Sequence, residues 1–321
     1  MTEVDAPPTV SVIIPTRNRK ALLETSLTTV EEQKDVSLEV IVVDDASTDD
    51  TPATLSQLAE GGRLRWLRNP RPMGAAVSRN LGAEMARGEF IAFNDDDTVW
   101  KPNKLARQVE AMRANPDASL CHAYQEIVGH DNVARKIGDE SFVGPETYRE
   151  MLTRFPITTA VMLTPRADFE AVGGFDPTLP RLQDWELGLR LARRGSLVMV
   201  PEVLIQNILL PGGISSNHEA LETAADLVYE KVAREHGPTS TEAGLLSMGL
   251  AHALLVHGRS ERGKAYLRRA RKRIPGDPRL KAMSRAAALG AWSYRGLMWL
   301  RGRMHDTPLD AVVKAFWRRN S

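Results

Sequence analysis

Short apolar runs alternate with segments of helical periodicity through the first third of the sequence. The apolar runs cover residues 9–15, 38–44 and 89–93, and a more polar run covers 63–69. Inside the first three runs apolar residues follow one another without alternation, so both faces of each strand are expected to be buried. Strands of this kind separated by helices predict an α/β fold with a mostly parallel sheet and helices on both faces.

The segments between these runs carry the signals at which helices begin and end. We expect Asn18 to cap a first helix, whose apolar stripe consists of Leu22, Leu23, Leu27 and Val30. A second helix is expected to begin near Asp49 or Asp50, and a third to end at Gly88. Further along the chain, residues 118–128 and 158–164 are predicted as strands, and residues 196–216 as a strand pair followed by a loop.

Polar residues gather directly after three of the predicted strands. They are Pro15-Thr16-Arg17, Asp44-Asp45 and the consecutive acids Asp95-Asp96-Asp97. Ligands of parallel α/β sheets bind beyond the carboxyl ends of the strands, so these three loops are expected to meet at one crevice. Three neighbouring carboxylates repel one another and raise each other's pKa, which favours a bound cation among them.

Composition excludes several classes of protein. The chain has 321 residues, of which 42% are hydrophobic and 26% charged, as in ordinary globular proteins. A single cysteine, Cys121, excludes an internal disulfide and a cysteine-rich zinc site. The first residues lack the pattern of a secretory signal, and no apolar run reaches the roughly 20 residues of a membrane-spanning helix. We therefore expect a cytoplasmic protein.

From about His218 the sequence is expected to be wholly helical. Residues 241–280 predict a helix, a turn at Gly258 and a second helix, followed by a stop at the Pro-Gly-Asp-Pro sequence. This hairpin is similar to one tetratricopeptide unit, and no second copy follows. The predicted organisation is a domain over residues 1–217 and a C-terminal helical region with a basic tail over 218–321.

Charge is distributed unevenly along the chain. Residues 259–321 hold 17 of the 42 Lys and Arg residues but only four of the 41 Asp and Glu residues. Residues 291–304 also interleave arginines with aromatic and aliphatic residues. This tail is expected either to pack on the protein or self-associate, or to lie on an anionic membrane surface, inside the cell at the inner membrane. No motif supports binding of nucleic acid.

Four motifs occur in an order that is typical of a known family. They are "VSVIIPTRNR", "EVIVVDDASTDDT", "MGAAVSRNLGAEMARGEFIAFNDDDTVWKPNKL" and "VGGFDPTLPRLQDWELGLRLARRG". Over roughly residues 9–217 the chain resembles the family 2 glycosyltransferases, which have the Rossmann-like GT-A fold. The resemblance implies transfer of a sugar from a nucleotide-diphosphate sugar to an acceptor, here an unknown hydroxyl compound.

The resemblance assigns a divalent metal, Mn²⁺ or Mg²⁺, to the acidic triplet. Asp97 is then the metal ligand, Asp95 reaches the metal through water, and Asp96 contacts the ribose or the sugar. A metal between carboxylates and diphosphate stabilises the negative charge of the leaving group. The alternative is a solvated acidic turn that caps the helix after Pro102.

The nucleotide is assigned to the two other loops. By resemblance, Asp45 accepts a hydrogen bond from the ring N–H of uracil, which favours UDP or dTDP over GDP, while Asp44 orients the loop. Pro15, Thr16 and Arg17 would flank the base, and Gly74, Arg79 and Asn80 would support the base and the diphosphate. The alternatives are helix capping by Asp44, Asp45 and Ser47, and a surface role for Arg79.

Asp184 matches the carboxylate that the family uses as general base, which implies inversion at the anomeric carbon. The alternative is an N-cap of the following helix. Gln183 replaces the Glu that usually precedes this Asp, and Trp185 is expected either at the acceptor or in the core. Leu210 stands where the family often has a histidine before a "GGxS" loop. Either the metal has fewer protein ligands, or His218 supplies one.

The predicted function is therefore inverting transfer from a UDP- or dTDP-sugar by metal-assisted direct displacement. A sugar nucleotidyltransferase would need a Gly-rich phosphate loop after the first strand, which "IIPTRNRK" lacks. A catalytically inert nucleotide-sugar-binding or scaffold protein is the second alternative. The presence of Asp45, Asp97 and Asp184 together argues against it.

Overall fold

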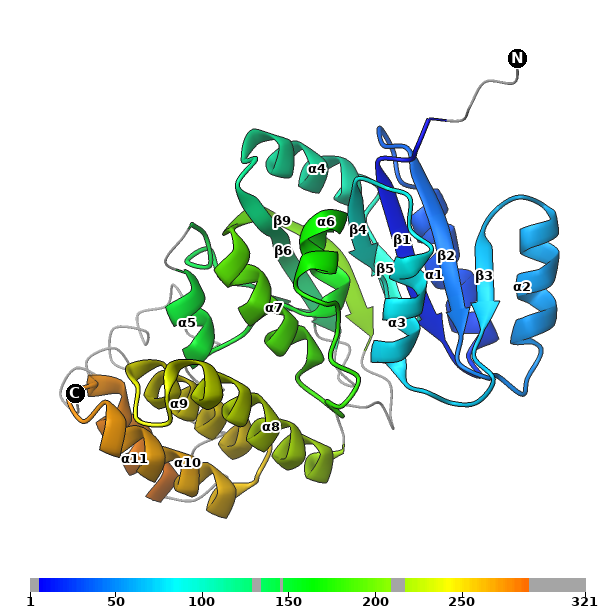
Figure 1. Ribbon diagram of the computed structural model, residues 1–321. Coiled ribbons are helices and arrows are strands. Elements are labelled where there is room, and N and C mark those ends of the chain that lie inside the picture. The colour runs from blue at the N-terminus through cyan, green and yellow to red at the C-terminus, as the bar shows by residue number, and fades with distance from the viewer. Residues whose placement is uncertain (1–5, 129–133, 145–146, 209–216, 289–321) are drawn as a thin grey trace. The chain divides into compact units, whose positions relative to one another are not determined.

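The computed structural model describes residues 6–128, 134–144, 147–208 and 217–288 (Figure 1). The chain divides into two compact units. The first consists of Met1–Tyr148, Pro156–Thr178 and Gln183–Gly213, and the second of Arg149–Phe155, Leu179–Leu182 and Ile214–Ser321. Two short segments of the middle section thus belong to the C-terminal unit.

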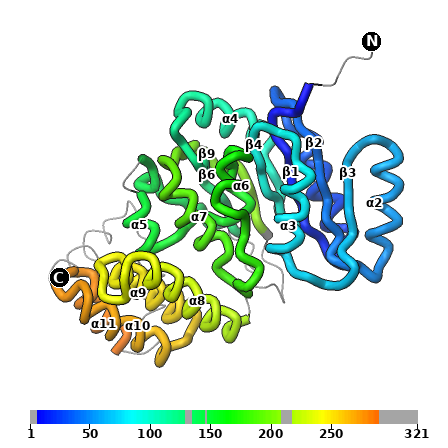
Figure 2. The backbone as a smooth tube through the Cα atoms, viewed as in Figure 1, coloured from blue at the N-terminus to red at the C-terminus, as the bar shows by residue number. Residues whose placement is uncertain are grey.

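The amino-terminal half of the first unit contains the predicted parallel strands. These are β1 (Val10–Thr16), β2 (Leu38–Asp44), β3 (Arg65–Arg68) and β4 (Phe90–Phe93), in the spatial order β3-β2-β1-β4. Every pairing among them is parallel. Figure 2 follows the chain through the alternating strands and helices α1 (Lys20–Glu31), α2 (Thr51–Glu60) and α3 (Ala75–Glu84). The predicted α/β fold is confirmed, and this half of the sheet is the parallel part.

The remaining strands make the sheet mixed. They are β5 (Thr98–Trp100), β6 (Ala118–Val128), β7 (Ala134–Ile137), β8 (Leu163–Pro165) and β9 (Ser196–Ile208). Beyond β4 the order is β8-β6-β9-β5, with β7 paired to β6. The β4–β8, β8–β6, β6–β7 and β9–β5 pairs are antiparallel, while β6 and β9 are parallel. Because β8 is antiparallel to both β4 and β6, these two strands run in the same direction, and their carboxyl ends share one edge.

The helices of the first unit cover this sheet. In sequence, α4 (Lys104–Ala114) follows β5, and α6 (Arg166–Ala171) and α7 (Gln183–Arg194) precede β9. Helix α5 (Thr147–Thr153) falls mostly in the second unit. Helix α3 packs on β1 and β2. A Cβ atom on Gly82 would lie 2.5 Å from Cγ2 of Ile13, so only glycine permits this close approach of helix and strand.

Four local predictions are wrong. Helix α3 ends at Glu84 and not at Gly88. Asn18 does not cap the first helix, because it has a φ of 53° and Arg19 occupies the N-cap position. Residues 158–164 do not form one strand, since Thr159–Val161 is a 3₁₀ turn before β8. Residues 196–208 form one strand instead of a pair. Its pairing with β6 steps from Ala123–Val200 to Tyr124–Val203, so Pro201 lies in a β-bulge. A proline is tolerated there because a bulged residue does not have to donate a backbone hydrogen bond to the neighbouring strand.

The second unit confirms the predicted C-terminal helices. They are α8 (His218–His236), α9 (Thr241–Val256), α10 (Ser260–Arg273) and α11 (Pro278–Ala288). The turn at Gly258, where φ is 79°, and the stop after Arg273 lie where the sequence predicts them. Within the described parts of both units, no helix is long and apolar enough to cross a membrane.

Candidate active site

The carboxyl ends of β1, β2 and β4 bring the predicted polar loops into contact. The backbone N–H of Asp45 donates to the carbonyl oxygen of Thr16 at 2.8 Å. The hydroxyl of Thr16 donates to Oδ2 of Asp96 at 2.9 Å. Thr16 therefore links the loop after β2 to the acidic triplet after β4. The three loops meet because their strands are parallel neighbours with aligned ends.

Two arginines pair with the three consecutive aspartates. Nη2 of Arg79, on α3, donates to Oδ1 of Asp95 at 2.6 Å. Nη1 of Arg19, at the start of α1, lies 2.9 Å from Oδ1 of Asp96 and 3.2 Å from Oδ2 of Asp97. Two arginines thus face three carboxylates, and one guanidinium nitrogen is shared between two of them.

This arrangement compensates the negative charge of Asp97 only in part, because Asp97 shares Arg19 with Asp96. Burial, together with the charges of Asp95 and Asp96, raises the pKa of Asp97 to about 6, although the charge of Arg19 opposes this rise. Burial also raises the pKa of Asp96, against the hydrogen bonds from Arg19 and Thr16. A carboxylate in this state gains from a nearby cation, which fits the divalent metal that the sequence predicts.

The donor set limits how such a metal is held. Within the ranges that the structure describes, no three His, Cys, Asp or Glu side chains gather as a metal site. Carboxylate oxygens suit Mg²⁺ or Mn²⁺, and Mg²⁺ is commonly bound by one or two carboxylates together with substrate phosphates. Asp95 and Asp97 fit a site of that type.

Arg79 connects the acidic triplet to α7. Its side chain is 9% exposed, and its Nη1 lies 3.5 Å from Oε1 of Gln183, the first residue of α7. The guanidinium also lies 5.4 Å from the ring centroid of Phe175. Nε of Arg79 is buried without a hydrogen-bond partner in the described residues. The surface role considered for Arg79 is therefore wrong, because the side chain is buried between three segments.

Asp184 lies in the first turn of α7, beside this arginine. Its Oδ1 accepts from the backbone N–H of its neighbour Trp185 at 2.8 Å. Burial raises the pKa of Asp184, the charge of Arg79 lowers it, and the charge of Asp95 raises it. The helix begins at Gln183, so Asp184 does not precede it as an N-cap would. Trp185 is 4% exposed.

Asp45 binds the loop between β3 and α3. Its Oδ1 accepts from Asn69 Nδ2 and from the backbone N–H of Met73, both at 2.7 Å, and its Oδ2 accepts from Gly74 N at 2.9 Å. The structure thus brings the predicted residues Asp45 and Gly74 together. Their role toward a base stays a prediction. Asp44 orients its own loop, as expected, since its Oδ1 accepts from Ser47 N at 3.0 Å.

Other candidates lie elsewhere. Pro15 pairs with Val43 inside the sheet, and Arg17 is exposed. Nδ2 of Asn80 donates to the carbonyl oxygen of Phe175, and Oδ1 of Asn80 accepts from the backbone N–H of Phe175, both at 2.8 Å. Asn80 therefore holds the loop that precedes α7. Arg19 is the residue that sequence reasoning missed. The sequence "PTRNR" contains an arginine on each side of Asn18. Only the local backbone conformation decides which of the two reaches Asp96 and Asp97.

Two further assignments are not tested by the geometry of the first unit, namely His218 as a metal ligand and Leu210 in place of the family's histidine. His218 begins α8 in the second unit, where its ring centroid lies 6.2 Å from that of His257. Leu210 and the "GGxS"-like loop lie outside the described residues. Both assignments stay predictions.

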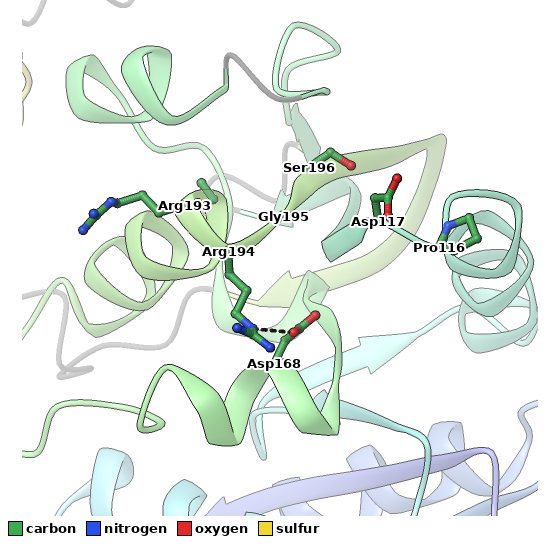
Figure 3. A pocket seen from close by; sticks show the side chains of 8 residues that line it. Pro116, Asp117, Asp168, Arg193, Arg194, Gly195 and Ser196 are labelled. Carbon is green, nitrogen blue, oxygen red and sulfur yellow. Dashed lines mark hydrogen bonds and ion pairs between the residues drawn. The ribbon is translucent and has the colours of Figure 1, made fainter.

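A polar hollow lies at the opposite edge of the sheet (Figure 3). It is lined by Pro116 and Asp117 before β6, by Asp168 on α6, and by residues 192–196 at the end of α7 and the start of β9. Figure 3 shows Arg194 extending to Asp168, with 2.7 Å between Nε and Oδ1. The hollow lies at the amino ends of β6 and β9, so it is separate from the polar loops at the carboxyl ends.

The chain is similar to glycosyltransferases in sequence. Residues 11–166 match the family model described as Glycosyl transferase family 2. TuaG of Bacillus subtilis, a glycosyltransferase named for teichuronic acid biosynthesis, is 32% identical over 234 residues, which are 71% of this chain and 90% of that protein. WfgD of Escherichia coli, a β-1,3-glucosyltransferase whose name gives UDP-Glc and a GlcNAc-diphosphoundecaprenol, is 33% identical over 44% of this chain and 54% of its own length.

Solved structures share the fold at lower identity. TarS from S. aureus, residues 1–349, in complex with UDP-GlcNAc, has a TM-score of 0.65 at 18% identity, covering 89% of each chain. The mannosyltransferase PcManGT from Pyrobaculum calidifontis, in complex with GDP-Man and Mn²⁺, has a TM-score of 0.59 at 21% identity, covering 91% of this chain and 84% of that one. With the sequence match to nearly the full length of TuaG, the GT-A fold and the acidic loops in place, this chain belongs to glycosyl transferase family 2.

Proposed function

We propose that this glycosyltransferase is an inverting enzyme that moves a sugar from a UDP- or dTDP-sugar to a hydroxyl acceptor in one displacement. One observation carries the proposal. Arg79 pairs with Asp95 at 2.6 Å and reaches Gln183 at 3.5 Å, beside Asp184, so the metal motif and the candidate base share one buried cation. Both halves of the reaction, departure of the diphosphate and activation of the acceptor, have their groups within this cluster.

The donor end of the proposed site uses Asp95, Asp96 and Asp97. A divalent metal bound there supplies charge stabilisation for the departing diphosphate. Asp97, whose carboxylate has unbalanced charge, would ligate it, with Asp95 as the second ligand. Asp96, whose carboxylate is held by Thr16 and Arg19, would contact the ribose or the sugar. The Mn²⁺ and GDP-Man bound to the mannosyltransferase neighbour are consistent with this assignment.

The acceptor end uses Asp184. A hydroxyl nucleophile must lose its proton as it attacks, and a carboxylate placed opposite the leaving group can accept that proton. Burial raises the pKa of Asp184, which makes it a stronger base than an exposed aspartate. Direct attack with the base on the far side of the sugar inverts the anomeric carbon.

The nucleobase is proposed to bind the loops after β1 and β2. Three protein donors already occupy the carboxylate of Asp45, and a carboxylate has about four acceptor positions. One position therefore remains for the ring N–H of uracil or thymine. The UDP-GlcNAc complex of TarS is consistent with a uridine donor.

The C-terminal region is proposed to meet an anionic partner. Of the predicted tail, residues 289–321 lie outside the described residues, but α10 carries the cations of 260–273 and Arg259 directly precedes it. Arg268, Arg271 and Lys272 are exposed on this helix. A membrane-borne acceptor would suit a peripheral contact of this kind, and self-association is the alternative.

The test is a binding and turnover screen. UDP, dTDP and GDP should be compared in thermal unfolding with Mn²⁺ and with EDTA, because a ligand stabilises the native state by mass action. UDP or dTDP should stabilise the protein and GDP should not, with the larger shift in Mn²⁺. Release of UDP from UDP-sugars then identifies the donor, and NMR of the product reports the anomeric configuration. A retained configuration, or equal shifts with all three nucleotides, would contradict the proposal.

A further inference from the structure

Arg19 occupies the position of a counter-ion within the acidic triplet. Its Nη1 lies 3.2 Å from Oδ2 of Asp97, and the same nitrogen lies 2.9 Å from Oδ1 of Asp96. The two aspartates differ in exposure, since the side chain of Asp96 is 6% exposed and that of Asp97 is 29% exposed. Asp96 also receives the hydroxyl of Thr16, whereas Arg19 is the one side chain recorded as donating to Asp97 within the described residues.

The backbone before α1 holds Arg19 in this position. Asn18 adopts a left-handed conformation, its backbone N–H donates to Ser47 Oγ at 2.9 Å, and its Oδ1 accepts from Thr48 N at 2.7 Å. The loop after β1 is therefore tied to the loop after β2, and the next residue is directed toward the loop after β4. The placement of Arg19 across two carboxylates is thus built into the fold.

We propose that Arg19 partly neutralises Asp97 in the free enzyme and that it moves from Asp97 to the diphosphate of the donor when a divalent cation and the donor bind together. This inference rests on the proposed function, in which Asp97 is a metal ligand. A guanidinium and a divalent cation at one carboxylate repel each other, so Arg19 weakens binding of metal alone. A guanidinium is also a strong, planar ligand of phosphate.

The consequence is coupled binding of metal and nucleotide. With Arg19 on Asp97, metal alone binds weakly. When the diphosphate is present, Arg19 gains a second anionic partner and the repulsion at Asp97 falls. Each ligand therefore raises the affinity of the other, and the coupling is reciprocal. The pair with Asp96, which is nearly buried, keeps Arg19 in the site throughout.

The test measures Mn²⁺ binding directly, by electron paramagnetic resonance of the free ion, with and without UDP. Arg19→Met should bind Mn²⁺ alone with a Kd about fivefold lower than the wild type, since a partly exposed ion pair contributes up to about that factor. UDP should bind this variant more weakly in Mn²⁺, so the ratio of Mn²⁺ Kd values without and with UDP should fall. Arg19→Gln should behave in the same way and serves if the Met variant unfolds.

Arg63→Met is the matched control, because Arg63 pairs with the exposed Glu31 at the far end of α1. Its Mn²⁺ and UDP affinities should equal those of the wild type. An Arg19 variant that binds Mn²⁺ alone no better than the wild type overturns this inference. A wild-type protein that binds no Mn²⁺ even with UDP contradicts the proposed function instead, so the two failures are distinguishable.

Discussion

Single residues at this site are held in states that are unfavourable for folding but useful for chemistry. Asp97 keeps a charge that its surroundings do not balance, and Nε of Arg79 is buried without a hydrogen bond in the described residues. An unpaired buried polar atom costs about 1–3 kcal/mol. Unsatisfied polar groups and perturbed carboxylates of this kind are common at functional sites.

Replacing the candidate base gives the first prediction. Asp184→Asn should lower turnover by about 10²–10⁴, the usual contribution of a general base, and should leave the affinity for UDP nearly unchanged. The amide keeps an oxygen for the backbone N–H of Trp185 but accepts no proton. Steady-state kinetics and calorimetry with UDP separate the two effects. Wild-type turnover in the variant would restrict Asp184 to a structural role.

The second prediction concerns stability at Asp97. Its pKa of about 6 in the folded protein lies above the ordinary value of 3.8, so the native state holds this proton more tightly than the unfolded state. Ionised Asp97 therefore destabilises the protein above about pH 6, and the effect disappears as the pH falls toward 3.8. Asp97→Asn should raise the melting temperature at pH 7.5, with a smaller gain at pH 5.

That variant should also lose the effect of Mn²⁺ on UDP binding. Thermal unfolding with EDTA measures the first effect, and calorimetry with Mn²⁺ the second. Asp168→Asn, at the polar hollow, removes a carboxylate from another part of the first unit and should show neither effect. A lower melting temperature for Asp97→Asn at pH 7.5 would mean that its pair with Arg19 outweighs the cost of burial.

At the level of elements, local periodicity predicts which residues of a single helix or strand are buried. The errors arise where contacts with segments distant in sequence determine the conformation. The burial of Leu23, Leu27 and Val30 follows from their spacing. The single strand β9 depends on a bulge at Pro201 that only its pairing with β6 reveals. Arg19 was missed for the same reason, because the left-handed conformation of Asn18 depends on Ser47 and Thr48, about 30 positions further along the chain.

The third prediction tests the loop between β3 and α3. Asp45→Ala leaves Asn69 Nδ2 and the backbone N–H groups of Met73 and Gly74 without their acceptor. Each loss is worth about 1 kcal/mol or more, so the melting temperature should fall by several degrees. UDP should bind more weakly, and the ratio of its affinities with Mn²⁺ and with EDTA should stay as in the wild type. Behaviour identical to that of Asp97→Asn would contradict the separate roles of the two carboxylates.

For the whole molecule, the sequence places most acidic residues in positions 1–258 and a surplus of basic residues in positions 259–321. The structure shows that part of this basic charge is balanced within the second unit. Arg259 pairs with Glu222, and Arg262 pairs with Asp226, both on α8. The prediction that the tail packs on the protein thus holds for one side of α10. The partner of residues 289–321 stays a prediction.

The exposed side of α10 carries the last prediction. Arg268, Arg271 and Lys272 are exposed there, and a cation near an anionic membrane contributes about 1 kcal/mol at low ionic strength. The protein should sediment with anionic vesicles of phosphatidylglycerol at low salt and be released at high salt. Reversing Arg268 and Arg271 to Glu should weaken this binding by at least about 30-fold, because two attractive charges are lost and two repulsive ones are gained.

Truncation in this experiment must spare the helices. Helix α11 packs on α9 and α10 and buries Leu280 and Met283, so the chain should be cut after Ala288. Reversal of Lys34 and Lys101 in the first unit is the matched control and should leave sedimentation unchanged. If the truncated protein binds as the full chain does and the α10 variant does not, α10 is the membrane contact. If the full chain ignores the vesicles at low salt, the basic residues serve packing or self-association, and the acceptor need not lie at a membrane.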